Sequence, residues 1–267
     1  MNGLMVHTEG SGLVSMEQAF AQQPSAAASQ TYHPVPNKEL WKMLSGTAQS
    51  RGLQLGVPQM GLARKGQRLF GSVEITNQDH LDGEVRLMLG FRNSGDKSMS
   101  IGVCFGSSVF VCDNMCFTGY TSEDEDAMGQ VHHRHSTNVF EGLQERLFAA
   151  MDKFEVFKNY QDDFYSRLKK RSLTDEEAHD LIIRSVRNEA ITAKDCFSVA
   201  EDWAFQHRGP ANEEEQERYH PEFAPRTAWS LFNAFTEVHK SFQKRNPVDA
   251  NLRGIKMSKF FHQQFMS

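Results

Sequence analysis

The pattern of apolar positions changes its period along this chain. From about residue 68 to 120, apolar and polar positions alternate, as in strands with one buried face. Residues 85–91 put an apolar set on one side, and Arg86 and Arg92 lie on the other. The alternation returns in residues 99–105. These runs predict antiparallel strands that have one covered and one open face.

A turn sequence and a further apolar run extend this prediction. The tetrapeptide Asn-Ser-Gly-Asp at 93–96 has the composition of a hairpin turn. Residues 107–117 are nearly continuously apolar, which is typical of a central strand covered on both faces. We therefore expect an antiparallel sheet of three to five strands over about 68–120.

After residue 138 the period becomes 3.6. An apolar stripe runs through residues 140–168 and predicts one helix of about 45 Å. Thr174 and Glu177 have the spacing of a capping box for the next helix, and Thr192 is placed to cap a third. A further helix is predicted over residues 227–242. A sheet followed by helices is the α+β pattern, so we expect the long helix and a C-terminal helical part to pack on the sheet.

The two ends differ from this central region. Residues 1–37 are rich in Gln, Ala, Ser and Pro, which predicts a flexible arm or a strap lying on the fold. Residues 38–245 form the expected single α+β domain, with its sheet in 51–120 and its helices in 138–245. Residues 246–267 are a basic and aromatic tail.

Composition narrows the class of protein. The chain has 267 residues, 39% of them hydrophobic, enough for a full core. It lacks an apolar run of the roughly 18 residues that a membrane span needs, and its N-terminus lacks the features of a secretory signal. Four cysteines are too few and too uneven for a disulfide framework. We therefore expect a cytoplasmic protein.

The net charge is −5, but the charges are segregated along the chain. From Lys240 onward there are six basic residues against one acid, Asp249. Phenylalanines alternate with these cations, the combination that single-stranded nucleic-acid binding uses. The other interpretation is an amphipathic helix that docks Phe260, Phe261 and Phe265 onto the core.

Two further segments have polar chemistry that packing does not require. Arg92, Asn93 and Lys97 suit recognition of phosphates and polar groups, although Asn93 and Asp96 also suit side-chain capping of a turn. Residues 134–137, Arg-His-Ser-Thr, combine cations with a helix start, which suits an anion site. The alternative there is a plain N-cap by the serine or threonine.

A metal or nucleophilic site is also conceivable. Cys112 and Cys116 precede a cluster of three histidines, His132, His133 and His135. Same-face positions four apart on a strand are about 13 Å apart, too far for one tetrahedral ion. Packed cysteines and a polar helix-initiating segment explain the same residues. Cys112 with His135 as nucleophile and base lacks an orienting third group, so we predict no metal, no cofactor and no catalytic residue.

Three stretches share their motifs with a known family: residues 90–114, 132–137 and 226–240. Together they resemble the phage- and plasmid-encoded family of proteins with a domain of unknown function, over about residues 60–245. The matching positions are Phe91, Arg92, Asn93, Asp96, Ser98, Cys112, Asn114, Arg134, His135, Thr137, Trp229, Asn233 and Thr236. The resemblance implies a mobile-element origin and work on phage or plasmid nucleic acid, but no reaction.

We therefore expect a non-enzymatic accessory protein of the host cytoplasm that binds single-stranded DNA and assists transcription, replication or recombination. The candidate contacts are Arg86, Arg92, Asn93, Lys97, Arg134, His135, Lys244, Arg245, Arg253, Lys256 and Lys259. A phage or host polymerase or recombination protein is a further candidate partner, and no membrane is expected. Two alternatives are a protein–protein effector that binds or inhibits a host or phage enzyme, and a metal-dependent enzyme. The sequence leaves open the choice between DNA and RNA and the oligomeric state.

Overall fold

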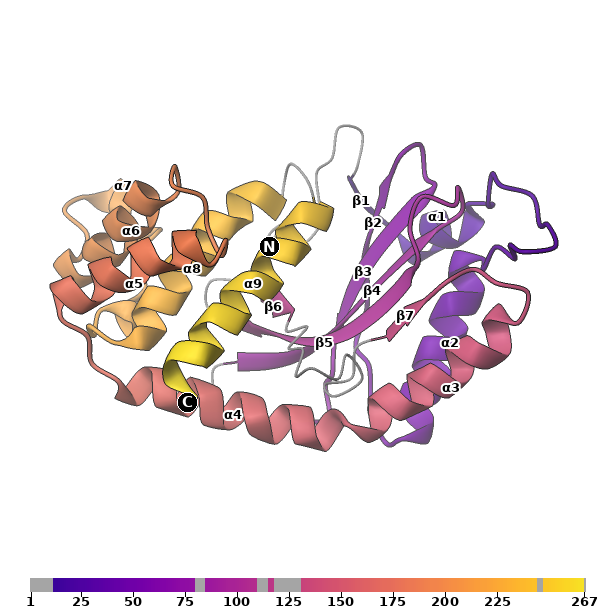
Figure 1. The fold of residues 1–267 in the computed structure, drawn as a ribbon, viewed down its shortest axis with the longest axis horizontal. Helices are drawn as coiled ribbons and strands as arrows, with labels where there is room; N and C mark the ends of the chain where they lie inside the picture. Colours follow the sequence, from indigo (N-terminus) through magenta and orange to yellow (C-terminus); the bar gives the residue numbers. More distant parts are fainter. Residues whose placement is uncertain (1–11, 80–84, 110–114, 118–130, 244–246, 267) are drawn as a thin grey trace.

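The computed structural model describes residues 12–79, 85–109, 115–117, 131–243 and 247–266 (Figure 1). The strands are β1 (Gly12–Val14), β2 (Gln59–Ala63), β3 (Arg68–Glu74), β4 (Val85–Ser94), β5 (Ile101–Val109), β6 (Met115–Phe117) and β7 (Val131–His133). The helices are α1 (Met16–Ala21), α2 (Asn37–Ser50), α3 (Val139–Asp152), α4 (Phe154–Lys170), α5 (Asp175–Arg187), α6 (Cys196–Arg208), α7 (Glu213–Gln216), the 3-10 helix η1 (Pro221–Phe223), α8 (Ala228–Gln243) and α9 (Pro247–Phe265).

The strands form one antiparallel sheet, which confirms the predicted α+β class. Within the described residues it has seven strands: six follow the order β1-β2-β3-β4-β5-β6, and β7 pairs with β5. The prediction of three to five strands was therefore too low. β1 and β7 have three residues each, too few for an alternating pattern to show. β2 lies before the region where the alternation begins.

One face of the sheet is covered by helices and holds much of the core. Phe91 packs against Trp41 of α2, with ring centroids 5.5 Å apart. Phe105 packs against Phe154 and Phe157 of α4 at 5.1 and 5.3 Å. Figure 1 shows α2, α3 and α4 lying along this side of the curved sheet. Apolar residues alternate onto this face because each successive strand residue points to the opposite side.

The opposite side, here called the polar face, has a different composition. Its alternate positions are Arg68, Phe70, Ser72 and Glu74 of β3, Arg86 and Arg92 of β4, Cys104 of β5 and His132 of β7. The predicted placement of Arg86 and Arg92 opposite the core is confirmed, since both are half-buried while their neighbours along β4 are buried. Met88 lies between them on the polar face and is also buried.

The single long helix expected over residues 140–168 is instead two helices, α3 and α4, which meet at Lys153. The Lys153 N–H donates to the carbonyl of Ala150, three residues back, at 3.1 Å. Such a bond tightens the helical turn and changes the direction of the chain. Apart from Phe140, which is 43% exposed, the apolar stripe is buried in both helices. Because of the break, the stripe stays in contact with the curved sheet along both helices, whereas a single straight helix would move away from the sheet.

The predicted capping box of α5 is confirmed. Thr174 Oγ1 accepts from the Glu177 N–H at 3.2 Å, and the Thr174 N–H donates to Glu177 Oε2 at 2.8 Å. The start of α6 differs from the prediction, because Asp195 occupies the N-cap position instead of Thr192. Thr192 instead donates from its N–H and hydroxyl to Asp195 Oδ2, at 2.9 and 2.7 Å.

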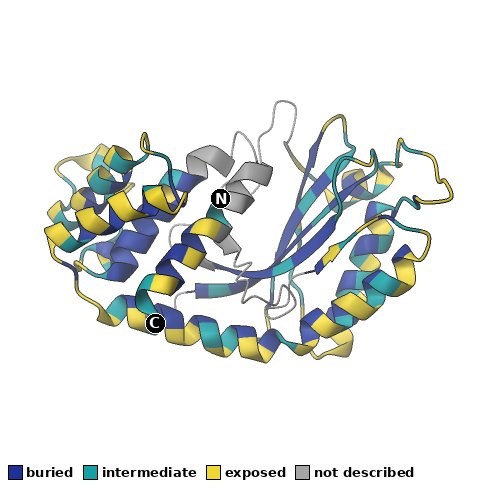
Figure 2. Cartoon of the chain, viewed as in Figure 1, coloured by how far each residue is buried: buried dark blue, intermediate teal, exposed yellow. Residues whose placement is uncertain are grey.

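The basic C-terminal tail contains the helix α9, which lies against α8 and α4 (Figure 1). Phe260 and Phe261 are buried, and Phe265 is half-buried. Figure 2 shows buried and exposed positions alternating along α9, as in an amphipathic helix. Phe261 meets Phe232 and Phe235 of α8 edge-on, each at 5.1 Å between centroids. The docked amphipathic helix is therefore the correct interpretation of these phenylalanines, and Phe260 and Phe261 are not available to stack on bases.

The described part of the N-terminal arm lies on the fold as a strap, here defined as residues 22–36. Its Ala26 N–H donates to the carbonyl of Gly95 at 2.9 Å, and its Val35 carbonyl accepts from Asn93 Nδ2 at 2.8 Å. Gly95 allows this approach, because a Cβ there would lie 2.8 Å from the Cα of Pro24. Of the two forms predicted for the arm, the strap is the one found in these residues.

Candidate nucleic-acid interface

Two turns lie side by side at one end of the sheet. Arg68, the first residue of β3, pairs with Ser94, the last of β4, so the β2–β3 and β4–β5 turns are neighbours. β7 runs antiparallel to β5 and pairs His133 with Ile101, which brings the following Arg134 to the same end. We call this region the cationic sheet end. Its members are Arg64, Lys65, Arg68, Arg92, Lys97 and Arg134.

Three of these cationic residues have backbone conformations that residues other than glycine rarely adopt. Arg64, Lys65 and Lys97 have positive φ angles of 49°, 54° and 66°. The left-handed region costs roughly 1–2 kcal/mol for a residue with a Cβ, and Gly or Asn is the usual choice there. All three are exposed, with 60% of the Arg64 side chain accessible. Charge is therefore present at the turn tips despite an unfavourable backbone.

Asp96 organises the cations around the β4–β5 turn. It accepts from the Ser98 N–H at 3.0 Å and from the Ser98 hydroxyl, and Ser98 Oγ accepts from Arg68 Nε at 2.8 Å. Burial opposes ionisation of Asp96, but the bonds from Ser98 and the charges of Arg68 and Arg64 outweigh it and lower its pKa. The predicted capping of this turn by Asp96 is confirmed.

Arg92 lies flat across the neighbouring strand. A Cβ at Gly102 would lie 2.8 Å from Arg92 Nε and 3.1 Å from its Cγ, so glycine leaves the room that the side chain occupies. Arg92 Nη2 reaches to 3.4 Å from His132 Nδ1. Its Nε has no hydrogen-bond partner among the described residues. Burial lowers the pKa of the guanidinium, which an anionic ligand would stabilise.

A thiol lies beside Arg92 on the same face. Burial raises the pKa of Cys104 to about 12, although the Arg92 charge works in the other direction. A thiol with such a pKa is protonated at neutral pH and is a poor nucleophile. The polar face therefore suits binding better than thiol chemistry. Cys112, the cysteine that the sequence analysis considered as a nucleophile, lies outside the described residues.

An aromatic cluster joins the strap to the cationic sheet end. Lys97 Nζ lies 4.6 Å from the centroid of the Tyr32 ring, and that ring lies 5.4 Å from the ring of His135. The His33 N–H donates to the His135 carbonyl at 3.1 Å. His135 is only 6% exposed, and burial lowers its pKa, so it is neutral and packed. Its prediction as a surface contact was wrong.

Asn93 was also predicted as a contact, and its position excludes that role. It is 1% exposed, and its amide nitrogen donates to the Val35 carbonyl at 2.8 Å and to Asn37 Oδ1 at 2.9 Å. The residue points to the covered face of β4, next to Arg92 on the polar face. Asn93 therefore holds the strap instead of a ligand. The predicted N-cap at Ser136 or Thr137 is likewise not found, because Asn138 occupies that position.

The remaining predicted contacts do not join the cationic sheet end. Arg86 lies six residues from Arg92 along β4, about 20 Å away, with Glu74 at 3.8 Å. On α9, Arg253 lies 3.8 Å from Asp195, and Lys256 pairs with Glu189. Lys259 is exposed on the same helix. Lys244 and Arg245 lie outside the described residues. The described cations among the predicted contacts therefore lie in three places: at the cationic sheet end, at Arg86 on β4, and on α9.

Sequence reasoning missed Arg64, Lys65, Arg68 and Tyr32. A signal existed for Arg64 and Lys65, since Arg64-Lys65-Gly66 lies between apolar runs and glycine marks a turn. Tyr32 had none, because its contact with Lys97 joins segments far apart in the sequence. Strand pairing decides which turns meet, and an alternating pattern alone does not specify that pairing.

Metal ligands and membrane spans are two further features to consider in the described part of the chain. No group of three or more His, Cys, Asp or Glu side chains there is arranged to hold a metal ion. His132 and His133 are described, whereas the side chains of Cys112 and Cys116 are not. None of the described helices combines the length and the apolar character needed to cross a membrane.

The fold and this site define a mixed α+β protein with an antiparallel sheet that presents cations at one end. The chain belongs to the family described as a domain of unknown function (DUF932), which matches residues 25–257. The match extends past the region 60–245 that carries the sequence motifs, into the strap and α9. No match was found among curated proteins or among solved structures.

Proposed function

We propose that this protein binds single-stranded nucleic acid at the cationic sheet end, as an accessory protein of a phage or plasmid that assists transcription, replication or recombination. The mobile-element origin rests on the motif resemblance. The proposal of a binding protein instead of an enzyme is supported by the arrangement of side chains described below.

One observation carries the proposal: cations from separate segments meet at one end of the sheet. Six cations converge there. Asp96 is the acid in their described contacts: it lies near Arg64 and is linked to Arg68 through Ser98. Lys65, Lys97 and Arg134 are exposed, and their pairing with acids is not part of the described network. Clustered cations that face solvent release counterions when they meet a phosphate backbone, which is the main source of affinity for nucleic acid.

The polar face adds a surface for bases. Phe70 pairs with Arg92, Arg92 pairs with Gly102, and Gly102 pairs with His132, so these side chains form a row across four strands. The row spans three strand spacings, about 14 Å. Phe70 is half-buried and His132 is exposed. Rings beside an arginine suit unpaired bases, which a duplex keeps stacked inside, so the arrangement favours a single strand.

The left-handed turn positions allow a test that spares the fold. The triple variant Arg64→Asn, Lys65→Asn and Lys97→Asn removes three charges and supplies the residue that tolerates positive φ. We expect an unchanged or higher Tm. Fluorescence anisotropy with a labelled oligo(dT) should show weaker binding. The slope of log affinity against log salt should fall by about 2, at roughly 0.7 for each phosphate that the protein no longer neutralises.

A matched control removes the same number of charges elsewhere. Lys42→Gln, Arg187→Gln and Lys194→Gln replace three exposed cations on or beside helices. The control should keep the affinity and slope of the unaltered protein. Equal loss in both triple variants, or an affinity for oligo(dT) that salt does not change, would overturn the proposal. Tighter binding to duplex than to single strand would overturn the choice of ligand.

A further inference from the structure

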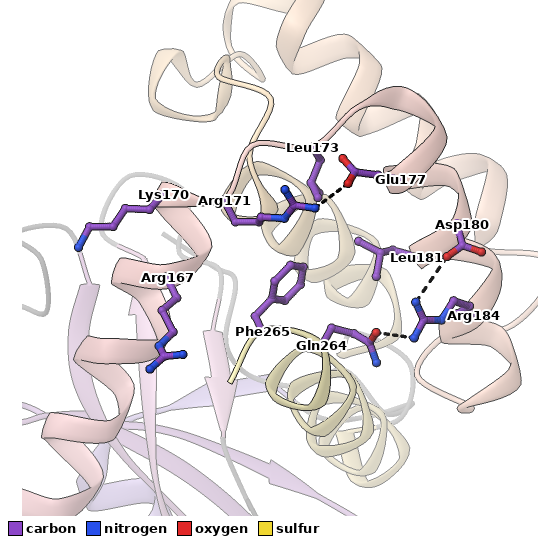
Figure 3. A pocket seen from close by; sticks show the side chains of 10 residues that line it. All are labelled: Arg167, Lys170, Arg171, Leu173, Glu177, Asp180, Leu181, Arg184, Gln264 and Phe265. Carbon is purple, nitrogen blue, oxygen red and sulfur yellow. Dashed lines mark hydrogen bonds and ion pairs between the residues drawn. The ribbon is translucent and has the colours of Figure 1, made fainter. Parts of the chain in front are cut away.

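A pocket of about 570 Å³ lies where α4 ends, beside α5 and the last turn of α9 (Figure 3). It is on the helical side of the molecule, away from the cationic sheet end, and the proposed function does not use it. Its volume is within the range of small-molecule sites, about 300–1,000 Å³. Leu173 and Leu181 provide a buried apolar floor.

An aromatic ring stands inside this pocket. Figure 3 shows the Phe265 ring in the middle of the lining side chains, with Arg171 on one side and Gln264 and Arg184 on another. Phe261, which is buried, stacks on Phe265 with 5.9 Å between centroids and 27° between planes. The ring is held by the core through Phe261, and Phe265 itself is only half-buried. It therefore offers an aromatic surface to a ligand.

Cations line this pocket. The lining contains four cations (Arg167, Lys170, Arg171 and Arg184) and two acids (Glu177 and Asp180), a net charge of +2. Arg171 binds Glu177 at 2.6 Å, and Arg184 lies 3.5 Å from Asp180 and 2.5 Å from Gln264 Oε1. About half of the Arg171 side chain (53%) is exposed. Exposed pairs of this kind contribute little, so an anion can compete for these guanidinium groups.

A second pocket provides a contrast within the same helical part. It has a similar volume of about 680 Å³, but five acids and two arginines line it, a net charge of −3. The acids are Asp195, Glu201, Asp202, Glu215 and Glu237, and the arginines are Arg208 and Arg218. Between these two pockets, the one around Phe265 is suited to an anion.

We propose that the pocket around Phe265 binds a nucleotide through its base and a terminal phosphate. The base packs on the Phe265 ring above the leucine floor, and the phosphate replaces the carboxylates as partner of Arg171 and Arg184. Arginine forms bidentate bonds with phosphate, and every base has a face that stacks on an aromatic ring. The nucleotide is either free or the phosphorylated end of a strand, because both present the same chemistry.

Isothermal titration calorimetry with the full chain tests this assignment. The probes are dTMP, thymidine, inorganic phosphate, and oligo(dT) with and without a 5′-phosphate. We expect dTMP to bind at least about tenfold more tightly than thymidine or inorganic phosphate, since each lacks one half of the recognition. If the ligand is a free nucleotide, dTMP should bind more tightly than the phosphorylated oligonucleotide. A strand end predicts tighter binding of the phosphorylated oligonucleotide than of either dTMP or the unphosphorylated strand.

Variants separate the pocket from the rest of the protein. Phe265→Leu keeps an apolar side chain but removes the ring, and should weaken dTMP binding at least about fivefold. Arg171→Gln with Arg184→Gln should weaken it about tenfold or more. Arg208→Gln is the matched control, because Arg208 also has 53% of its side chain exposed and is paired with a glutamate, in the acidic pocket.

The outcomes are distinct from those of the sheet-end test. The pocket assignment would be overturned if the Phe265 and arginine variants bound dTMP and both oligonucleotides with the same affinity as Arg208→Gln. The sheet-end triple variant should leave dTMP binding unchanged, and the pocket variants should leave the salt slope for unphosphorylated oligo(dT) unchanged. Tm measured for every variant identifies any loss of binding that comes from unfolding.

Discussion

Gly71 of β3 and Gly102 of β5 lie on opposite faces of the sheet, and alanine at each position tests the two faces separately. A Cβ at Gly71 would overlap the Phe91 ring, which is buried and packed against Trp41. At Gly102 the three nearest atoms, at 2.8–3.3 Å, all belong to the Arg92 side chain. The first neighbour is fixed by packing, whereas the second is flexible and can move.

The expected magnitudes follow from this difference. Gly71→Ala overpacks the core, which costs about 1–3 kcal/mol of unfolding free energy, or roughly 2–12 °C in Tm for a domain of this size. Gly102→Ala should cost less than this, because the Arg92 side chain can move away from the new methyl group. It should nevertheless weaken oligo(dT) binding several-fold, because the displaced Arg92 leaves its place beside His132.

Urea denaturation and anisotropy measure the two effects. In a Phe91→Leu background, Gly71→Ala should cost less than it does alone, because the leucine side chain lacks the ring that the new methyl group meets. Equal stability losses at the two glycines would refute the assignment of their faces. A Gly102→Ala variant with full affinity for oligo(dT) would show that Arg92 is not part of the interface.

Three further predictions concern stability. Burial lowers the pKa of His239 to about 4, with Arg253 adding to the effect, and that of His262 to about 3. In the unfolded chain these histidines have a pKa of about 6.5. Their contribution to the free energy of unfolding is therefore complete above that pH and is lost as pH falls towards 4 and 3. His262→Phe should reduce the loss of stability between pH 7 and 4, measured by urea denaturation. Thr174→Ala removes the side-chain half of the α5 capping box and should lower stability by about 1 kcal/mol, while Thr174→Ser should not. Gly46→Ala places a Cβ in open space within α2 and should raise stability by about 0.5–1 kcal/mol, measured as a higher urea midpoint.

Local signals predicted local structure well. The alternation in β4 placed Arg86 and Arg92 opposite the core, and the spacing of Thr174 and Glu177 located the start of α5, because both patterns depend on neighbours within a few residues. The break at Lys153 was not predictable from the apolar stripe, which continues through both helices. It depends on the curvature of the sheet beneath, which is a tertiary property.

The site was predicted less completely, for a similar reason. Arg92, Lys97 and Arg134 were identified from residue type, and the pairing of β3 with β4 and of β7 with β5 brings them to one end. Asn93 and His135 have the same polar character but point to the covered side or pack under the strap. Arg64 and Lys65 were missed because their turn joins the site only through the β2–β3–β4 register.

The strap has a consequence for the order of events during synthesis. Val35 is held by Asn93, 58 residues later, and His33 is held by His135. Contacts of such separation form late, because the intervening chain must first be ordered. At about 5–20 residues per second, the ribosome needs several seconds between making the strap and making its last anchor. During that interval the strap residues are without these partners, and the strap is not yet fixed to this end of the sheet.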